Sequence, residues 1–195
     1  SAVPFDFFQE EDELNMLNRL RQLDISADRG WIVAAPQAAS QLKTWNREGF
    51  RQVVRRLLEI QTEPVLLVGD TRERETAEAI ASVNPSRIYN LAGRTTLKEL
   101  AVLISRCGLL LANDSAAMHL GFEMQKPVVA IFGPTHDGKY GCVGPSFRIV
   151  REPVSCAPCE KPQCRFERQT CFEDLKPEKV LKACEELLHA NLSSV

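Results

Sequence analysis

Short apolar blocks alternate with amphipathic segments along most of this chain. The apolar blocks lie at 31–36, 64–69, 87–93, 108–114 and 127–133, with a sixth candidate strand at 147–152. The segments at 47–60, 71–83, 96–107, 115–124 and 176–190 carry apolar residues at helical spacing. Because the expected strands are almost wholly apolar and alternate with helices, the pattern predicts an α/β fold: a Rossmann-like, doubly wound parallel sheet.

The first thirty residues are acidic and contribute no strand. Their segment EEDELNMLNRLRQL places Leu14, Leu17 and Leu20 at a spacing of three, with Met16 between them, which predicts one amphipathic helix. We therefore expect a linker and helix at 1–30, a sheet domain at 31–155, a cysteine-rich loop at 156–171 and a closing helix at 172–195.

Composition narrows the classes of function. The chain has 195 residues and a net charge of −2, which gives no indication of nucleic-acid binding. No apolar run approaches the length of about 20 residues that spans a bilayer, and the first residues lack the features of a signal peptide. We expect no transmembrane segment and a cytoplasmic location.

One stretch, GPTHDGK at 133–139, has the spacing of a phosphate-binding P-loop. A P-loop needs Ser or Thr after its lysine, but Tyr140 follows Lys139. Pro134 removes one amide, and the sequence GCVGPS that follows does not favour a helix. The first strand is followed by APQAASQ, so a G-x-G-x-x-G dinucleotide fingerprint is also absent. A P-loop phosphotransferase and a dehydrogenase are both disfavoured.

A second stretch, LLLANDSAAMH at 109–119, runs from a buried strand directly into a helix. Asp114 or Ser115 is expected to cap that helix, and the amides of 115–117 then form an anion site. His119 follows Ser115 by four residues and shares its helical face. The simpler alternative is a structural cap and a partly buried histidine. The turn at 133–135 ends the next strand, so both strand ends are expected to meet in one crevice.

The segment NDSAAMHLGFEMQKPVVAIFGPT resembles the signature of the family 9 glycosyltransferases, the ADP-heptose:lipopolysaccharide heptosyltransferases and their relatives. Upstream, Lys43 and Trp45 match a family pattern in which Asn46 replaces the usual proline, and Gly69 and Glu73 match another. Ala116 departs from the usual glycine. The signature itself is matched by Asp114, Ser115, His119, Lys126, Pro127, Phe132, Gly133, Pro134 and Thr135.

The resemblance implies the carboxyl-terminal, donor-binding half of a GT-B enzyme. The parent protein would be a bacterial, inverting glycosyltransferase of lipopolysaccharide core synthesis that uses a nucleotide sugar such as ADP-heptose and requires no metal cofactor. The acceptor, a lipid-linked saccharide, and the general base would belong to the other half, so no catalytic residue is assigned and this fragment alone is expected to be inactive. Its location would be cytoplasmic, with peripheral contact at the inner face of the inner membrane left open.

The resemblance also implies roles for the donor site. We expect the amides of Ser115 and Ala116 to bind the diphosphate, with Lys43 as the cation. Asp114 would cap its helix or accept hydrogen bonds from sugar hydroxyls, and Glu73 would hold the ribose. The other expected donor contacts are His119, Gly133, Pro134 and Thr135, with Thr135 touching either phosphate or sugar.

Four of the seven cysteines form the spacing C-x2-C-x4-C-x6-C at Cys156, Cys159, Cys164 and Cys171. Four thiolates could bind a structural zinc ion, although the spacing is not that of a standard zinc finger. Free thiols, and disulfides in an oxidised sample, remain open as alternatives. The competing function is accordingly a non-catalytic nucleotide- or zinc-binding interaction module.

Overall fold

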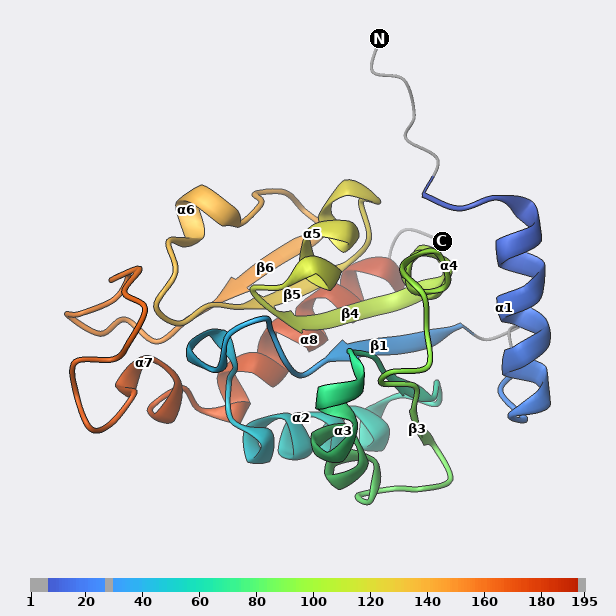
Figure 1. Cartoon of the computed structure of the whole chain (residues 1–195), viewed down its shortest axis with the longest axis horizontal. Coiled ribbons are helices and arrows are strands. Elements are labelled where there is room, and N and C mark those ends of the chain that lie inside the picture. Colours follow the sequence, from blue (N-terminus) through green and yellow to red (C-terminus); the bar gives the residue numbers. More distant parts are fainter. Residues whose placement is uncertain (1–6, 27–29, 193–195) are drawn as a thin grey trace, which may run out of the picture.

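A six-stranded parallel sheet forms the centre of the molecule (Figure 1). The structure is a computed structural model and describes residues 7–26 and 30–192. The strand order is β3-β2-β1-β4-β5-β6, so the chain moves to one edge of the sheet and then returns to build the other. The strands are β1 (Trp31–Ala35), β2 (Val65–Leu67), β3 (Ile88–Asn90), β4 (Cys107–Asn113), β5 (Val128–Ile131) and β6 (Phe147–Val150).

Helices and single turns connect and flank these strands. The longer helices are α1 (Glu10–Gln22), α2 (Arg47–Ile60), α3 (Arg74–Ala81), α4 (Leu97–Ser105), α5 (Ala116–Glu123) and α8 (Pro177–Leu192). The short turns are η1 (Gln41–Lys43), η2 (Thr71–Glu73), α6 (Asp137–Tyr140) and α7 (Thr170–Glu173). The predicted α/β fold and all six predicted strands are confirmed.

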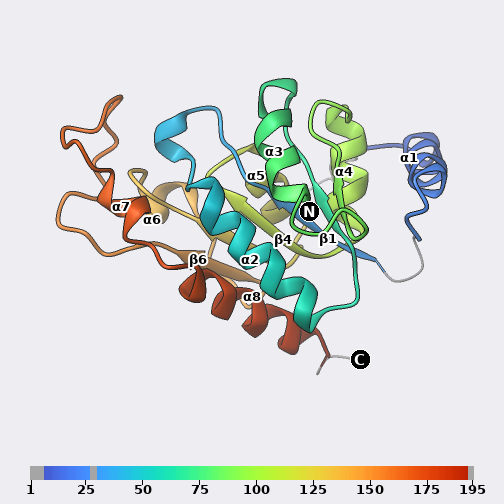
Figure 2. The same ribbon diagram turned by 90° about the horizontal axis from the view of Figure 1, so that it is seen from below.

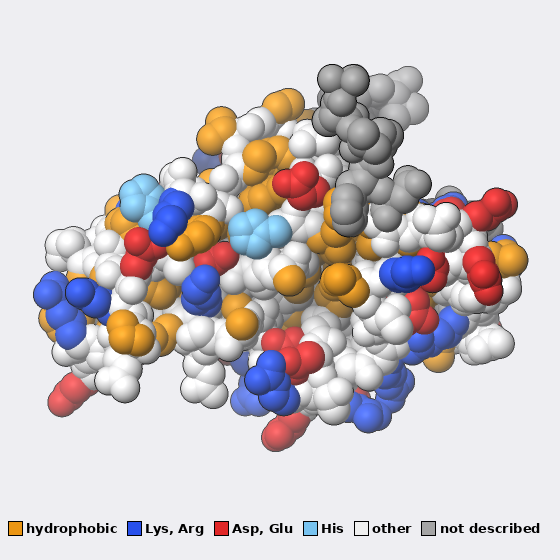
Figure 3. Space-filling model, turned by 45° about the horizontal axis from the view of Figure 1, so that its top comes forward, with side chains coloured by type: hydrophobic (Ala, Val, Ile, Leu, Met, Phe, Trp, Pro, Cys, Tyr) orange, Lys and Arg blue, Asp and Glu red, His pale blue; other side chains and the backbone are white. Residues whose placement is uncertain are grey.

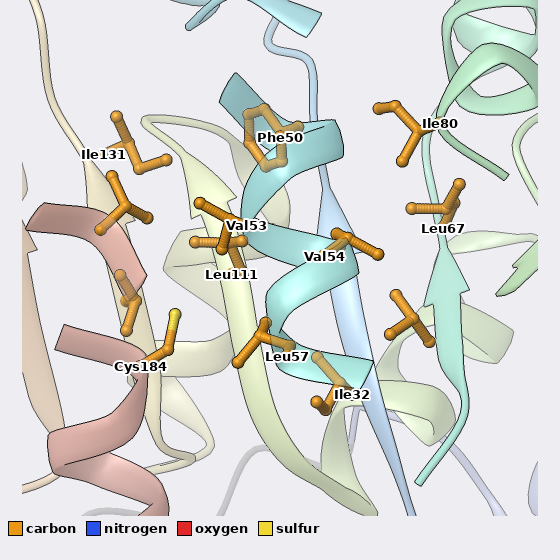
Figure 4. Packing of buried hydrophobic residues seen from close by; sticks show 14 of the residues in the cluster. Ile32, Phe50, Val53, Val54, Leu57, Leu67, Ile80, Leu111, Ile131 and Cys184 are labelled. Atoms are coloured by element: carbon orange, nitrogen blue, oxygen red, sulfur yellow. The ribbon is translucent and has the colours of Figure 1, made fainter. Parts of the chain in front are cut away.

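The two faces of the sheet bury separate hydrophobic clusters. Helices α2, α3 and α8 cover one face, where Phe50, Val53 and Leu57 of α2 pack on the strands with no exposed surface (Figures 2 and 4). Helices α1, α4 and α5 cover the other. Each Å² of apolar surface removed from water stabilises the fold by about 25 cal/mol. The two buried layers therefore hold the sheet, and with it the strand ends, in place.

Helix α1 packs on the outside of α4 through Met16 and Leu20, which are fully buried. Arg19 donates to Glu99 at 3.1 Å and Lys98 to Asp12 at 3.1 Å. Leu14, which the spacing of three placed on the same apolar stripe, is 55% exposed. Residues 1–6, 27–29 and 193–195 of the expected linker and closing helix lie outside the described part.

Besides the short turns η1 and α7, which were not predicted, local structure departs from the sequence pattern at three further places. The helix expected at 71–83 begins as the 3₁₀ turn η2, because Asp70 accepts a hydrogen bond from Arg72 at 2.8 Å and the turn closes there. Cys107, the last residue of the helix expected at 96–107, is instead the first residue of β4. The GPTHDGK segment contains one helical turn, α6, where none was expected.

Candidate functional site

A cavity of about 550 Å³ opens at the carboxyl ends of β1, β2 and β4. The loop after β1, the turn η2 and the start of α5 line it. Six of the nine predicted donor-site residues share this cavity. They are Lys43, Glu73, Asp114, Ser115, Ala116 and His119.

Asp114 is the charged centre of the cavity. Its side chain is only 4% exposed, and its Oδ2 accepts a hydrogen bond from Lys43 Nζ at 2.8 Å. The Nε2 atom of His119 lies 3.7 Å from Oδ1. Lys43 therefore offsets a nearly buried carboxylate that would otherwise repel an anion in this cavity.

The start of α5 differs from the predicted cap. Ser115 occupies the N-cap position, but its side chain accepts no capping hydrogen bond, and Asp114 is paired with Lys43. In the described part of the chain the buried Ser115 hydroxyl has no hydrogen-bond partner. First-turn amides lack intrahelical acceptors, so the absence of a side-chain cap keeps them accessible to a ligand. The expectation that Asp114 or Ser115 caps this helix is wrong in that respect.

Asn113, the last residue of β4, fixes the loop that carries Lys43. Its side chain is fully buried, accepts a hydrogen bond from Trp45 N at 3.1 Å and donates to Pro36 O at 2.8 Å. The indole of Trp45 in turn donates to Phe172 O at 3.2 Å. Asn113 was not predicted as a site residue, although a polar amide at the end of an apolar strand is a signal in the sequence.

Asn46, which stands where the family pattern has proline, caps α2. Its Oδ1 accepts a hydrogen bond from Gly49 N at 2.7 Å. A β-carbon on Gly49 would lie 2.3 Å from the ring of Trp45, so this glycine is required by the close approach of the indole. The loop that carries Lys43 is thus held at its start, where Asn113 binds Pro36 O, and at its end, where Asn46 caps α2, although Asn46 departs from the family pattern.

Glu73 lies at the far side of the cavity from α5. Its Oε2 accepts a hydrogen bond from Asp70 N at 2.7 Å. Burial raises the pKa of the Glu73 carboxyl above its usual range, against the opposing effect of that hydrogen bond. A β-carbon at Gly69 would lie 2.0 Å from Oε2, so the glycine leaves space for this carboxylate. Arg72 and Leu100, which were not predicted as site residues, also line the cavity.

The remaining predicted residues, Gly133 to Thr135, follow β5 at the same sheet edge. Asn113 and Ile131 are paired in register, so the ends of β4 and β5 lie side by side, but the two strand ends line separate cavities rather than the single crevice that was expected. Pro134 and Thr135 line a neighbouring cavity of about 320 Å³ that shares Ser40 and Lys43 with the first. Gly133 packs against the ring of Phe172, where a β-carbon would approach within 2.5 Å.

Figure 3 shows the molecule turned so that its top comes forward. Acidic, basic and histidine side chains lie next to one another in the left half of this view.

In the P-loop-like segment, Lys139 Nζ lies 3.8 Å from Glu160 and 4.8 Å from the centroid of the Tyr140 ring. That lysine is not among the residues that line either cavity.

The four clustered cysteines surround one small cavity with an accessible volume of about 20 Å³. They lie at different depths, from buried Cys171 to exposed Cys164, and all are free thiols. Within residues 7–26 and 30–192, no three histidine, cysteine or acidic side chains are placed to hold a metal ion. The four thiols line one cavity, but among these described residues they are not grouped as metal ligands, so the structural zinc site proposed from the spacing stays a prediction.

The fold and the cavity together define a Rossmann-like domain with a polar cavity at the carboxyl edge of its sheet. A family model described as glycosyltransferase family 9 (heptosyltransferase) matches residues 5–170. The chain belongs to this family.

Related proteins agree with the match. Lipooligosaccharide heptosyltransferase 2 of Campylobacter jejuni is 32% identical over 154 residues, which cover 75% of this chain and 47% of that protein. The structure of a family 9 glycosyltransferase from Veillonella parvula matches with a TM-score of 0.83 at 22% identity, over 97% of this chain and 54% of that one. The structure of E. coli ADP-heptose lps heptosyltransferase II gives 0.75 at 22% identity, over 94% and 53%.

The chain thus spans about half the length of the relatives it matches. Its fold corresponds to one Rossmann-like half of GT-B heptosyltransferases. Among the described residues, no helix has both the length and the apolar character needed to cross a lipid bilayer.

Proposed function

We propose that this chain binds the nucleotide-sugar donor of an inverting heptosyltransferase of lipopolysaccharide core synthesis. The donor is ADP-heptose, the compound in the name of the similar E. coli heptosyltransferase II structure, or a close relative of it. The acceptor is a lipid-linked saccharide held by a second domain outside this chain, at the cytoplasmic face of the membrane. The observation that carries the proposal is the start of α5, uncapped by side chains, beside the Lys43–Asp114 pair in one cavity.

The chemistry of transfer suits this arrangement. A base outside this chain removes a proton from the acceptor hydroxyl, whose oxygen attacks the anomeric carbon while the nucleoside diphosphate leaves. Negative charge then builds on the diphosphate. Lys43 and the amides of Ser115 and Ala116 are positioned by the fold before the reaction, so they stabilise that charge without reorganisation.

The other residues of the cavity bind the remaining parts of the donor. Glu73 accepts hydrogen bonds from the ribose hydroxyls at the β2 end. His119 lies within α5, with its side chain 50% exposed, and contacts phosphate or ribose. Pro134 and Thr135 form the wall on the other side of Lys43.

Calorimetry of the chain with ADP, in buffer containing EDTA, tests the proposal. We expect saturable 1:1 binding that Lys43→Ala weakens and Lys139→Ala leaves unchanged. Binding that requires Mg²⁺ and is lost in Lys139→Ala would instead identify a P-loop site. A chain that binds neither ADP nor ADP-heptose would contradict the proposal and favour an interaction module.

A matched thermal experiment gives the expected size. At a ligand concentration of 100 Kd, binding stabilises the folded chain by about 2.7 kcal/mol. For a chain of this length each kcal/mol raises Tm by roughly 2–4 °C. ADP should therefore raise Tm by about 5–10 °C, and the Lys43→Ala variant should show a much smaller shift at the same ADP concentration.

A further inference from the structure

The cavity of about 320 Å³ next to the donor pocket is enclosed by parts of the chain far apart in sequence. The loop of Lys43, the turn after β5, the short helix α6 and the cysteine-rich loop each contribute to its lining. Lys43 lines both cavities. A diphosphate bound at Lys43 therefore borders both cavities.

Thr135 gives the second cavity a polar group that the protein itself does not satisfy. The residue is 7% exposed, and its Oγ1 is buried without a hydrogen-bond partner in the described part of the chain. Leaving a buried hydroxyl unpaired costs roughly 1–3 kcal/mol, so such groups are rare outside functional sites. A ligand hydroxyl in the cavity supplies the missing partner.

Glu160 lines the same cavity from a strained backbone position. Its φ is 49°, in the left-handed region that non-glycine residues seldom adopt. The amides of Cys159 and Glu160 both donate to Pro134 O at 2.9 Å, which holds the loop against the turn that carries Thr135. Strain that the surroundings maintain in this way is concentrated at ligand sites.

Tyr140 completes the wall with an amphipathic ring. Lys43 Nζ lies 5.5 Å from the ring centroid on the donor side. The cavity thus combines a hydroxyl, an aromatic ring, the ammonium groups of Lys43 and Lys161, and a carboxylate whose Oε1 lies 3.8 Å from the Nζ of Lys139. This set suits a polyhydroxylated ring with an apolar C–H face.

We propose that this second cavity receives the sugar of the nucleotide sugar, with Thr135 and Glu160 as residues that determine specificity for its hydroxyls. The inference rests on the proposed function, since the sugar enters only as part of a donor whose diphosphate lies at Lys43. Glu160 accepts hydrogen bonds from two neighbouring hydroxyls, and Thr135 exchanges one with a third.

The experiment compares two probes, ADP and ADP-heptose, by calorimetry on the whole chain. Thr135→Val removes the hydroxyl at nearly constant shape, and Glu160→Gln removes the charge. For ADP-heptose we expect Kd to rise about three- to tenfold for Thr135→Val and tenfold or more for Glu160→Gln. For ADP the Kd of both variants should stay within about twofold of the parent, because ADP does not reach this cavity.

Two controls keep the result interpretable. Thr135→Ser retains the hydroxyl and should bind ADP-heptose like the parent, so it carries the test should Glu160→Gln fail to fold. Glu167→Gln alters an exposed carboxylate of the same loop outside the cavity and should change neither affinity.

The outcomes separate the two proposals. Equal losses for ADP and ADP-heptose, or unchanged ADP-heptose binding in Thr135→Val and Glu160→Gln, would overturn the sugar site while leaving nucleotide binding intact. Failure of the parent chain to bind ADP at all would overturn the proposed function itself. A Thr135→Ser variant as weak as Thr135→Val would also contradict the inference, since the hydroxyl would then not be the group that matters.

Discussion

Removing Lys43 tests how the site tolerates a carboxylate beside an anionic donor. In the Lys43→Ala variant, Asp114 keeps its 4% exposed side chain but loses the ammonium at 2.8 Å. At a separation of about 5 Å and an effective dielectric constant near 20, an uncompensated carboxylate repels a phosphate charge by roughly 3 kcal/mol. The lost charge-assisted hydrogen bond to phosphate contributes about 1.5–3 kcal/mol more.

The net effect should be smaller than the sum of these values. The Lys43 side chain is 34% exposed, so water and salt screen both interactions. We expect a net loss of about 2–3 kcal/mol, or a Kd for ADP raised by roughly 30- to 150-fold. The assay is calorimetry at two ionic strengths, with the larger difference between parent and variant at low salt.

A double variant identifies the cause. If repulsion by Asp114 accounts for part of the loss, adding Asp114→Asn to Lys43→Ala should recover part of the affinity. Lys98→Ala is the matched control, because it breaks an ion pair of 3.1 Å with Asp12 on the α1–α4 surface. Affinity that stays within about twofold of the parent in Lys43→Ala, or no recovery in the double variant, would refute this reasoning.

Three further predictions concern stability, pH and thiol reactivity. Asn113→Ala should lower the free energy of unfolding by about 2–4 kcal/mol in urea denaturation, since Trp45 N and Pro36 O lose their buried partner; a loss below about 0.5 kcal/mol would contradict this. Affinity for ADP should be full above the raised pKa of Glu73 and fall as the pH decreases through it, because ribose hydroxyls donate to the ionised carboxylate. Glu73→Gln should flatten this pH profile, and an unchanged profile in that variant would assign the effect to another group. A thiol reagent should modify exposed Cys164 first in the native protein. Burial raises the pKa of the Cys107 thiol to about 12 and also raises that of Cys184, so mass spectrometry should find these two cysteines labelled only after unfolding.

Periodicity and strand apolarity were sufficient to predict the sheet and its helices. The inner strands β1, β2 and β5 are buried on both faces, as in WIVAA of β1, so their sequences carry a strong and local signal. The short turns η1, α6 and α7 carry no such signal, because three or four residues show no helical period. Their positions depend on contacts from distant segments, such as Gln169 donating to Leu42 O at 2.6 Å.

The candidate site was predictable where the residues directly follow strands. Asp114, Ser115 and Glu73 lie in the cavity because parallel strands end at one edge of the sheet. The partner of Asp114 was not predictable from spacing, since Lys43 is 71 residues away and reaches it only through the anchored loop after β1. The prediction of a side-chain cap on α5 was wrong for the same reason: that distant lysine engages the carboxylate.

The measurement closest to the central claim is a titration of the isotope-labelled chain with ADP, followed by amide NMR chemical shifts in the presence of EDTA. Saturable shifts centred on the amides of Ser115, Ala116 and Ala117, with smaller changes around Lys43 and Glu73, are what a diphosphate bound at the start of α5 predicts. Shifts confined to the α6 turn around Lys139, or to the cysteine-rich loop, would place the nucleotide elsewhere and contradict the claim.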